Sequence, residues 1–177
     1  LSWGTCGGLI AGLHGGDLLL PERVRDEAGG VHEVDVAWRE RVIRAVSDLE
    51  PRGGVLLSSA QVLSRPADKL AAAGCADAVD MESAAIAEVA AATGLPFLEL
   101  RVVVDDSAQS LPSALLAAVD ALGRPRMSCA LQALLGHPAQ WRQVWMLGRS
   151  FSRARAILRR AAAVKPGALA FPGTAQA

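Results

Sequence analysis

Apolar and polar positions alternate in short blocks along the first hundred residues, and the blocks predict strands and helices in turn. Short apolar runs predict strands at Leu1–Trp3, Asp17–Leu20, Val55–Leu57, Ala76–Asp80 and Phe97–Val104. Apolar residues at roughly helical spacing predict helices over 36–49, 66–73 and 82–93. Strands that alternate with helices are typical of an α/β layer sandwich.

Glycine, proline and capping residues set the expected ends of these elements. The run Gly4-Thr5-Cys6-Gly7-Gly8 predicts a tight loop after the first strand. Ser64 is a candidate cap for the helix that has Pro66 in its first turn. Gly94 closes the alanine-rich helix, and Pro96 stops it from continuing.

The clearest unit is the strand Ala76–Asp80, the helix that follows it and the strand Phe97–Val104. A strand, a crossover helix and a strand of this size predict a parallel, right-handed βαβ unit. Residues that follow the carboxyl ends of neighbouring parallel strands lie at one edge of the sheet. We therefore expect Glu82 and Asp105 to lie close together.

Beyond residue 107 the chain is predicted to be mostly helical, with breaks at Gly123-Arg124-Pro125 and Gly136-His137-Pro138. Residues 141–160 carry six arginines and no acidic residue, and their apolar residues repeat at helical spacing. Such a helix can lie on an anionic membrane surface or pack on its own domain with solvated arginines, and the second interpretation is favoured. The tail over 165–177 is expected to be flexible.

Composition and charge narrow the class of protein. With 177 residues, 51% of them apolar, the chain has the size of one domain and can bury a core without disulfides or metals. The formal net charge of zero argues against disorder and against a general nucleic-acid binder, which gains affinity by neutralising phosphates. No stretch is long and apolar enough for a membrane span, and no export signal opens the chain.

The cysteines Cys6, Cys75 and Cys129 are odd in number and lack the spacing of a metal site. This pattern indicates a reducing, cytoplasmic compartment, and we expect no disulfide between Cys75 and Cys129. The basic segment 141–160 leaves the inner face of the membrane open as a location.

The first predicted strand begins at residue 1, which is Leu. A domain rarely begins at the end of a strand, so we interpret residues 1–177 as a single domain that lacks its first strand or strands. We expect the missing segment to pair beside Leu1–Trp3. Without it, the open strand edge should make the chain poorly soluble.

Three polar places follow the predicted strands, where ligands bind in open α/β sheets: Gly4–Gly8, Asp80-Met81-Glu82 and Asp105-Asp106. Two carboxylates that converge on a cleft can do acid chemistry and recognise hydroxyl groups. Each place also has a plain structural interpretation, because glutamate complements a helix dipole, aspartate caps or turns the chain, and glycine makes tight turns. Their combination at one edge favours a functional site.

Longer motifs connect these places. They are Trp3-Gly4-Thr5-Cys6-Gly7-Gly8-Leu9, Gly16-Asp17-Leu18, Ala78-Val79-Asp80-Met81-Glu82-Ser83-Ala84-Ala85-Ile86-Ala87, Leu95-Pro96-Phe97 and Arg101-Val102-Val103-Val104-Asp105. In these motifs the chain resembles the nucleoside phosphorylase and nucleosidase superfamily, above all the methylthioadenosine/S-adenosylhomocysteine nucleosidases. The resemblance implies a three-layer α/β/α sandwich with a mixed, largely parallel central sheet.

The resemblance also implies an activity, the cleavage of the N-glycosidic bond of a purine nucleoside. It implies that Asp105 protonates or hydrogen-bonds the purine N7 and that Glu82, as a carboxylate, binds the ribose hydroxyls. It implies further substrate contacts at Thr5, Cys6, Gly7, Gln61, Val62, Asp80 and Met81. A homo-oligomer without metal or cofactor is implied, and phosphate stays open as a co-substrate.

Three departures from the superfamily's pattern bear on the reaction. Ser2 stands where several phosphorylases carry a phosphate-binding arginine, which weakens the case for phosphorolysis. Val104 replaces the serine that usually precedes the catalytic aspartate, and no aromatic residue occurs over 59–62, where the nucleosidases pack the purine. The residues that handle the nucleophile are expected upstream of residue 1, so both water and phosphate stay open.

Two further motifs bear on the substrate: Leu111-Pro112-Ser113-Ala114 and Val119-Asp120-Ala121-Leu122-Gly123-Arg124-Pro125. They resemble the hopanoid-associated phosphorylase branch, which is implied to release adenine from adenosylhopane, an adenosylated lipid. One alternative is a nucleosidase for soluble thioadenosines. Another is a catalytically dead fragment that acts as a binding or assembly module.

Overall fold

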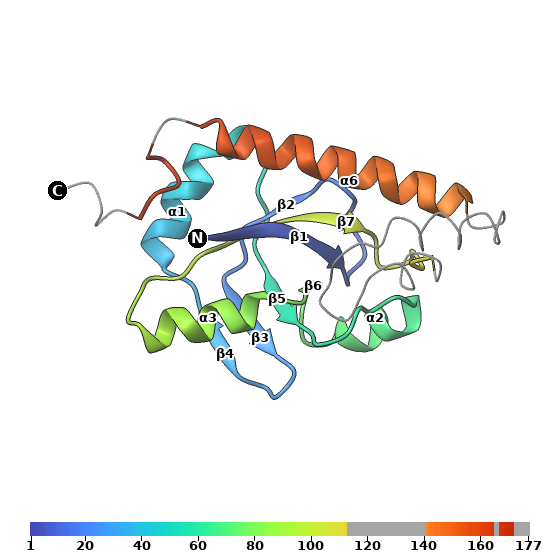
Figure 1. The fold of residues 1–177 in the computed structure, drawn as a ribbon, viewed down its shortest axis with the longest axis horizontal. Coiled ribbons are helices and arrows are strands. Elements are labelled where there is room, and N and C mark those ends of the chain that lie inside the picture. Colours follow the sequence, from blue (N-terminus) through green and yellow to red (C-terminus); the bar gives the residue numbers. More distant parts are fainter. Residues whose placement is uncertain (113–140, 165–166, 172–177) are drawn as a thin grey trace, which may run out of the picture.

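A seven-stranded sheet runs through the middle of the molecule in the computed structural model, and helices lie on both of its faces (Figure 1). The structure describes residues 1–112, 141–164 and 167–171. The strands are β1 (Ser2–Gly8), β2 (Leu18–Leu19), β3 (Arg23–Asp26), β4 (Val31–Glu33), β5 (Val55–Ser58), β6 (Ala78–Asp80) and β7 (Glu99–Asp105). The helices are α1 (Val36–Ala45), the short 3-10 helix η1 (Ser47–Leu49), α2 (Pro66–Ala72), α3 (Ser83–Ala92) and α6 (Trp141–Ala162).

The strand order is β2-β7-β1-β6-β5-β3-β4, which makes the glycine-rich β1 an inner strand. The pairs β7–β1, β6–β5 and β5–β3 are parallel. The pairs β2–β7, β1–β6 and β3–β4 are antiparallel. The expected mixed α/β sheet is confirmed, with parallel pairing in half of its neighbouring pairs.

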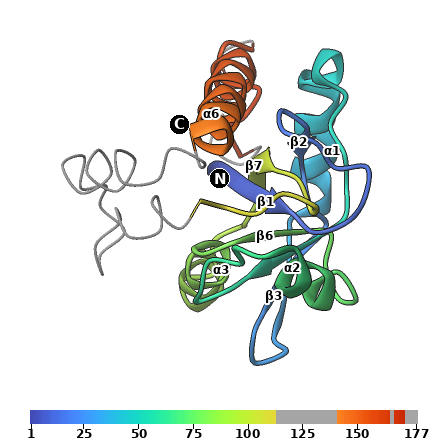
Figure 2. The same cartoon turned by 90° about the vertical axis from the view of Figure 1, so that its right-hand side faces the viewer.

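Three layers are visible when the molecule is turned, with α1 and α6 above the sheet and α2 and α3 below it (Figure 2). Every residue of β7 is buried, because the strand lies in the middle layer. Trp38 and Val42 of α1, Ala154 of α6 and Ala84 of α3 belong to the same buried apolar cluster as Leu100 of β7. Removal of this apolar surface from water, at about 25 cal/mol per Å², holds the layers together.

The segment Gly4–Gly8 is part of a strand and not the loop that its glycine content predicts. Glycine has a low preference for strands, but β7 pairs with β1 from Ser2 to Gly7 and holds it extended. The register shifts between Cys6 and Gly7, which marks a β-bulge. Pairing with a strand far along the chain therefore overrides the local preference.

The predicted parallel βαβ unit is wrong. β1 lies between β6 and β7, and β6 and β7 run in opposite directions because β1 is antiparallel to β6 and parallel to β7. The local pattern of strand, helix and strand carries no sign of a strand from elsewhere in the chain that inserts between the two.

The helix boundaries agree in part with the capping residues. Pro66 begins α2, as expected, but the N-cap is Arg65, which makes no side-chain capping bond, and not Ser64. Gly94 has a positive φ of 66° just after α3, as a glycine that closes a helix should. The antiparallel hairpin of β3 and β4, with Gly29 in its turn, was not predicted.

The basic segment near the carboxyl end is helical, as predicted, and forms α6. The predicted breaks over 123–125 and 136–138, Cys129, and most of the motifs over 111–125 and of the tail 165–177 lie outside the described residues. Among the described cysteines, Cys6 and Cys75 are free. None of the described helices has the length and hydropathy that a membrane span needs.

Candidate active site

Asp105, the last residue of β7, is a buried carboxyl group beside β1, with Gly7 as its register partner. Lys69 of α2 donates a hydrogen bond from Nζ to Asp105 Oδ2. Burial raises the pKa of Asp105 above its ordinary value, the bond and charge of Lys69 act against this rise, and the charge of Asp106 adds to it. A carboxyl group that holds its proton to higher pH is suited to general acid catalysis.

Asp106, the next residue, binds the neighbouring loop at the end of β7. Its Oδ1 accepts a hydrogen bond from the Gly15 backbone N–H at 2.9 Å, and its Oδ2 lies 3.3 Å from His14 Nδ1. Both partners belong to the loop between β1 and β2, so Asp106 ties this loop to β7. The turn-making role that the sequence allowed for both aspartates therefore falls to Asp106.

Gly7 allows the Asp105 carboxyl group to approach β1 closely. A Cβ atom at Gly7 would lie 3.2 and 3.3 Å from the two carboxyl oxygens of Asp105 and 3.4 Å from Val79 Cγ1. These distances are shorter than ordinary contacts in a packed interior. Any side chain at this position would displace the Asp105 carboxyl group.

We expect Gly7→Ala to destabilise the protein by about 1–3 kcal/mol, which is the usual effect of overpacking a core. Gly4→Ala is the matched control, because its Cβ would lie on the same strand at an ordinary 3.6 Å from Arg101 Nη1. Urea unfolding of both variants measures the difference. Equal losses from both would mean that the crowding of Asp105 is not the cause.

Asp80, at the end of β6, caps α3. Its Oδ1 accepts hydrogen bonds from the backbone N–H groups of Glu82, at 3.4 Å, and Ser83, at 3.2 Å, and its Oδ2 accepts one from the Ser83 hydroxyl. Glu82 occupies the N-cap position, but its side chain makes no capping bond. The side chains of Glu82 and of its neighbour Met81 are exposed. The Glu82 carboxylate therefore stays accessible to a ligand.

Arg101 connects β6 and β7 through a buried charge cluster under β1. Its Nε donates to Asp80 Oδ2 at 2.8 Å, and its Nη1 lies 2.7 Å from Glu99 Oε2. Its Nη2 donates to the hydroxyls of Ser2 and Ser83, each at 2.9 Å. Burial raises the pKa of Glu99 to about 7, although the charge of Arg101 acts against this rise. Both Asp80 oxygens accept hydrogen bonds inside the protein, from Ser83 and Arg101. Asp80 therefore has a structural role and is not free to bind a ligand.

The strands β6 and β7, which end in Asp80 and Asp105, both pair with β1. The two acidic segments therefore meet beside β1, although β6 and β7 are not the parallel neighbours that the sequence predicted. Burial is the main cause of the raised pKa of the Cys6 thiol, and the charges of Asp80 and Asp105 both add to it. Cys6 therefore lies within electrostatic reach of both carboxyl groups and keeps its proton. Thr5 and Gly7, which flank it on β1, are both partly buried.

Gln61 and Val62 are exposed in the loop that follows β5. The Ser59 hydroxyl organises this loop, because it donates to Glu27 Oε1 at 2.6 Å and accepts from the Gln61 N–H at 3.2 Å. β5 and β6 are parallel, so this loop and Met81 follow the carboxyl ends of neighbouring strands. The structure brings these predicted contact residues to one edge of the sheet.

Two residues of the site were not recognised as such in the sequence: Lys69 and Arg101. Lys69 looks like an ordinary exposed residue of a short helix, and Arg101 lies in a run of apolar strand residues. One signal was present for Lys69, since 16 of the 18 basic residues are arginine and a lysine is unusual in this chain.

One group among the described residues has the geometry to hold a metal ion. The potential ligand atoms of Asp26, His32 and Glu88 lie within 4.8 Å of one another. These residues belong to the β3–β4 hairpin and to α3 and do not include a predicted site residue.

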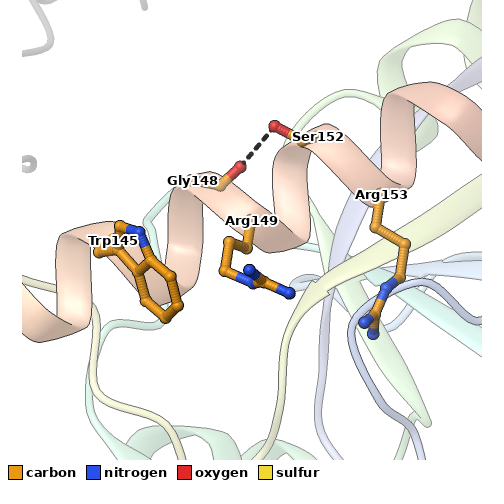
Figure 3. A pocket seen from close by; sticks show the side chains of 5 residues that line it. All are labelled: Trp145, Gly148, Arg149, Ser152 and Arg153. Atoms are coloured by element: carbon orange, nitrogen blue, oxygen red, sulfur yellow. Dashed lines mark hydrogen bonds between the residues drawn. The ribbon is translucent and has the colours of Figure 1, made fainter.

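An open pocket lies on α6 and is lined by Trp145, Gly148, Arg149, Ser152 and Arg153 (Figure 3). The Arg149 guanidinium group lies 4.8 Å from the centroid of the Trp145 ring, which is a cation–π contact. Arg153 Nη1 donates at 2.9 Å to the Gly15 carbonyl, in the same loop that Asp106 binds. The pocket thus combines an aromatic wall with positive charge.

The sequence matches the profile of the phosphorylase superfamily over residues 1–135. No curated protein sequence is significantly similar to the chain. The match includes all of the predicted site residues.

Solved structures of similar fold include three from bacterial proteins. The methylthioadenosine/S-adenosylhomocysteine nucleosidase of Helicobacter pylori has a TM-score of 0.60 at 17% identity, and the aligned part covers 90% of this chain and 65% of the nucleosidase. The native futalosine hydrolase of H. pylori has a TM-score of 0.59 at 17% identity, with coverages of 90% and 65%. The nucleosidase of Neisseria meningitidis has a TM-score of 0.52 at 23% identity, with coverages of 59% and 55%. The chain thus spans 55–65% of the length of these proteins, and the likeness establishes the fold.

Proposed function

The chain belongs to the phosphorylase superfamily, and on that premise we propose that it cleaves the N-glycosidic bond of a purine nucleoside. One observation carries the proposal: in each acidic pair, one carboxyl group binds backbone N–H groups and the other binds none among the described residues. Asp106 binds the β1–β2 loop while Asp105 lies buried against Gly7. Asp80 caps α3 while Glu82 is exposed.

Asp105 is the proposed general acid. Cleavage of the bond between ribose and purine sends the bonding electron pair onto the purine, and a proton delivered to N7 neutralises that charge. Burial raises the pKa of Asp105 above its ordinary value, which favours the protonated form that an acid catalyst needs. A weakly acidic group next to the leaving base thus improves the base as a leaving group.

Glu82 is the proposed ligand of the ribose hydroxyls. Its negative charge also favours the positive charge that develops on the sugar in the transition state. Met81, exposed beside it, offers an adaptable apolar wall. Thr5, Cys6 and Gly7 on β1 are the proposed floor of the site.

Gln61 and Val62 are proposed to contact the purine from the loop after β5. The nucleophile is water or phosphate. Ser2 stands at the position of the arginine that several phosphorylases use for phosphate, and its hydroxyl is already bound to Arg101, which favours water.

The proposed substrate is an adenosylated lipid, adenosylhopane, and the proposed place of action is the cytoplasmic face of the membrane. The exposed side of α6 supports this choice, because Trp145, Met146 and Phe151 are exposed on a helix that carries six arginines and no acid. A basic helix with exposed aromatic residues suits an anionic lipid surface. The inner side of the same helix belongs to the main buried core through Ala154 and Ala161.

A soluble thioadenosine is the second candidate substrate. The observation in its favour is the fold similarity to two nucleosidases that act on methylthioadenosine and S-adenosylhomocysteine. Adenine release from adenosylhopane in detergent, from methylthioadenosine and from S-adenosylhomocysteine, with and without phosphate, distinguishes the substrates. Release that needs phosphate and yields a ribose 1-phosphate product identifies phosphorolysis.

We expect Glu82→Gln in the full-length protein to lower the rate of adenine release by about 10² or more, because the neutral amide cannot stabilise the sugar cation. Glu88→Gln, which removes another exposed carboxylate of α3, should leave the rate unchanged. Adenine release is followed by chromatography. A near-normal rate for Glu82→Gln would remove Glu82 from the site.

A binding or assembly module remains a distinct outcome of the same assay. Such a module would bind adenosyl compounds in calorimetry and release no adenine from any of them. That result would overturn the proposed enzyme.

A further inference from the structure

Lys69 is the largest side chain that is fully buried among the described residues. It lies on α2, and its exposed fraction is 0%. A lysine is almost never fully buried unless its charge is paired, because removal of an ammonium group from water costs several kcal/mol. The role of Lys69 can therefore be inferred from the groups that its ammonium group binds.

The described partners of the Lys69 ammonium group all lie at or just after the end of β7. Nζ donates to Asp105 Oδ2, to the Asp106 carbonyl at 2.8 Å and to the Gln109 carbonyl at 3.0 Å. An ammonium group has three N–H donors and no acceptor, so its hydrogen-bonding capacity is used completely. This contact ties α2 to the strand end that carries the proposed acid.

The hydrogen bonds reach only one of the two carboxyl oxygens of Asp105. Lys69 occupies Oδ2, and among the described residues no hydrogen bond reaches Oδ1. Oδ1 lies close against Gly7, because a Cβ at that position would be only 3.2 Å from it. The carboxyl group is thus held through Oδ2, while Oδ1 makes no hydrogen bond with the described residues.

We propose that Lys69 is a positioning residue that holds Asp105 through Oδ2, presents Oδ1 to the departing purine and stabilises the carboxylate that proton donation leaves behind. The inference rests on the proposed function. The proton passes from Asp105 Oδ1 to the purine N7, and the electron pair of the broken glycosidic bond goes to the purine. The negative charge that remains on Asp105 then faces a positive charge already in place.

Other charged groups around Asp105 come from the elements packed against it. Asp106 follows it in the chain, and His14 of the β1–β2 loop lies against Asp106 rather than against Asp105. On β1, the Cys6 thiol keeps its proton because burial raises its pKa. Lys69 is thus the cation that faces the carboxyl group directly among the described residues.

The sign of the pH effect follows from this arrangement. The charge of Lys69 lowers the pKa of Asp105 against the rise caused by burial. Removal of the charge in Lys69→Met should therefore raise that pKa, and the rate should persist to higher pH before it falls. The acid also becomes weaker, so the maximal rate should drop.

The experiment compares Lys69→Met, Lys69→Arg and Arg65→Gln in the full-length protein. Arg65→Gln is the matched control, because it removes a cation at the start of α2 whose ion pair with Asp68 is exposed. Two readouts are taken: the pH dependence of kcat for adenine release, and the carbon-13 titration of the Asp105 carboxyl group. The second readout needs no activity.

For Lys69→Met we expect the alkaline limb of kcat and the carboxyl titration to move upward together by about one pH unit or more, with kcat lowered at least about 10-fold. Lys69→Arg keeps the positive charge, so the alkaline limb of kcat should stay in place. Its kcat should be lower, because the larger guanidinium group shifts the Asp105 carboxyl group. Arg65→Gln should change neither. A purely structural role for Lys69 would lower the yield of folded protein without moving the limb.

Unchanged titration and limb in folded Lys69→Met would overturn the inference. If that variant does not fold, an alkaline limb that moves in Lys69→Arg, although the positive charge is kept, would overturn it instead. A carboxyl titration that moves, in a protein that cleaves no adenosyl compound, would overturn the proposed function and leave the coupling of Lys69 and Asp105 standing.

Discussion

Asp105→Asn is expected to lower the rate of adenine release by about 10² or more, the usual contribution of a positioned general acid. The amide has nearly the shape of the carboxyl group but cannot transfer an acidic proton to N7. KM should change much less than kcat, because the lost interaction forms in the transition state and not in the bound substrate.

Asp106→Asn is the matched control for this variant. It removes the neighbouring carboxylate, which binds His14 and Gly15 at the surface, and should retain most of the activity. Steady-state kinetics on both variants, with circular dichroism to verify folding, measures the difference. Comparable losses of kcat in the two variants would show that charge near the end of β7, rather than proton donation by Asp105, supports the reaction.

Arg101→Met is expected to lower the free energy of unfolding by about 3–5 kcal/mol, which is typical when one partner of a buried ion cluster is removed. The substitution leaves the carboxyl groups of Asp80 and Glu99 buried without their cation. A whole domain is stable by only about 5–15 kcal/mol. This single change therefore removes a large share of the stability of the fold.

The loss in Arg101→Met should depend on pH. Because the pKa of Glu99 is raised to about 7 in the folded protein, the folded state binds its proton more tightly than the unfolded state. This group therefore contributes stability at low pH that is lost as the pH rises toward 7. Without Arg101 the carboxyl group holds its proton more tightly still, so the deficit should be larger at pH 8 than at pH 5.

Urea unfolding at both pH values tests this expectation. Arg44→Met is the control, because Arg44 forms an exposed ion pair with Glu40, and such pairs contribute about 0–1 kcal/mol. A deficit in Arg101→Met that is the same at both pH values would remove Glu99 from the explanation.

The polar residues at strand ends could be predicted from the sequence because local rules govern them. Asp105 and Glu82 follow short apolar runs, and a ligand site after a strand needs no knowledge of the rest of the chain. The separation of roles within each acidic pair could not be predicted. It depends on Gly15 and Ser83, whose N–H groups reach Asp106 and Asp80 only in the folded chain.

The strands that pair with β1 could not be predicted from the local sequence for a related reason. Glycine-rich residues 4–8 have a weak strand preference, and only the pairing with β7 makes them extended. The burial of Lys69 could not be predicted either. An amphipathic pattern finds the buried face of a helix from its apolar side chains, so it places a lysine on the exposed face. A buried charge is recognised by its acceptors, and those of Lys69 lie on another element.

The pairing of β1 with β7 has a consequence for the way the chain is made. Ser2 pairs with Glu99, so nearly a hundred residues must leave the ribosome before β1 finds this neighbour. At the usual rate of synthesis that interval is roughly 5–20 s, and contacts of such long range slow folding further. During this time β1 exposes backbone groups and apolar side chains to every other nascent chain nearby. A holdase chaperone that shields β1 until β7 emerges would raise the yield of native protein.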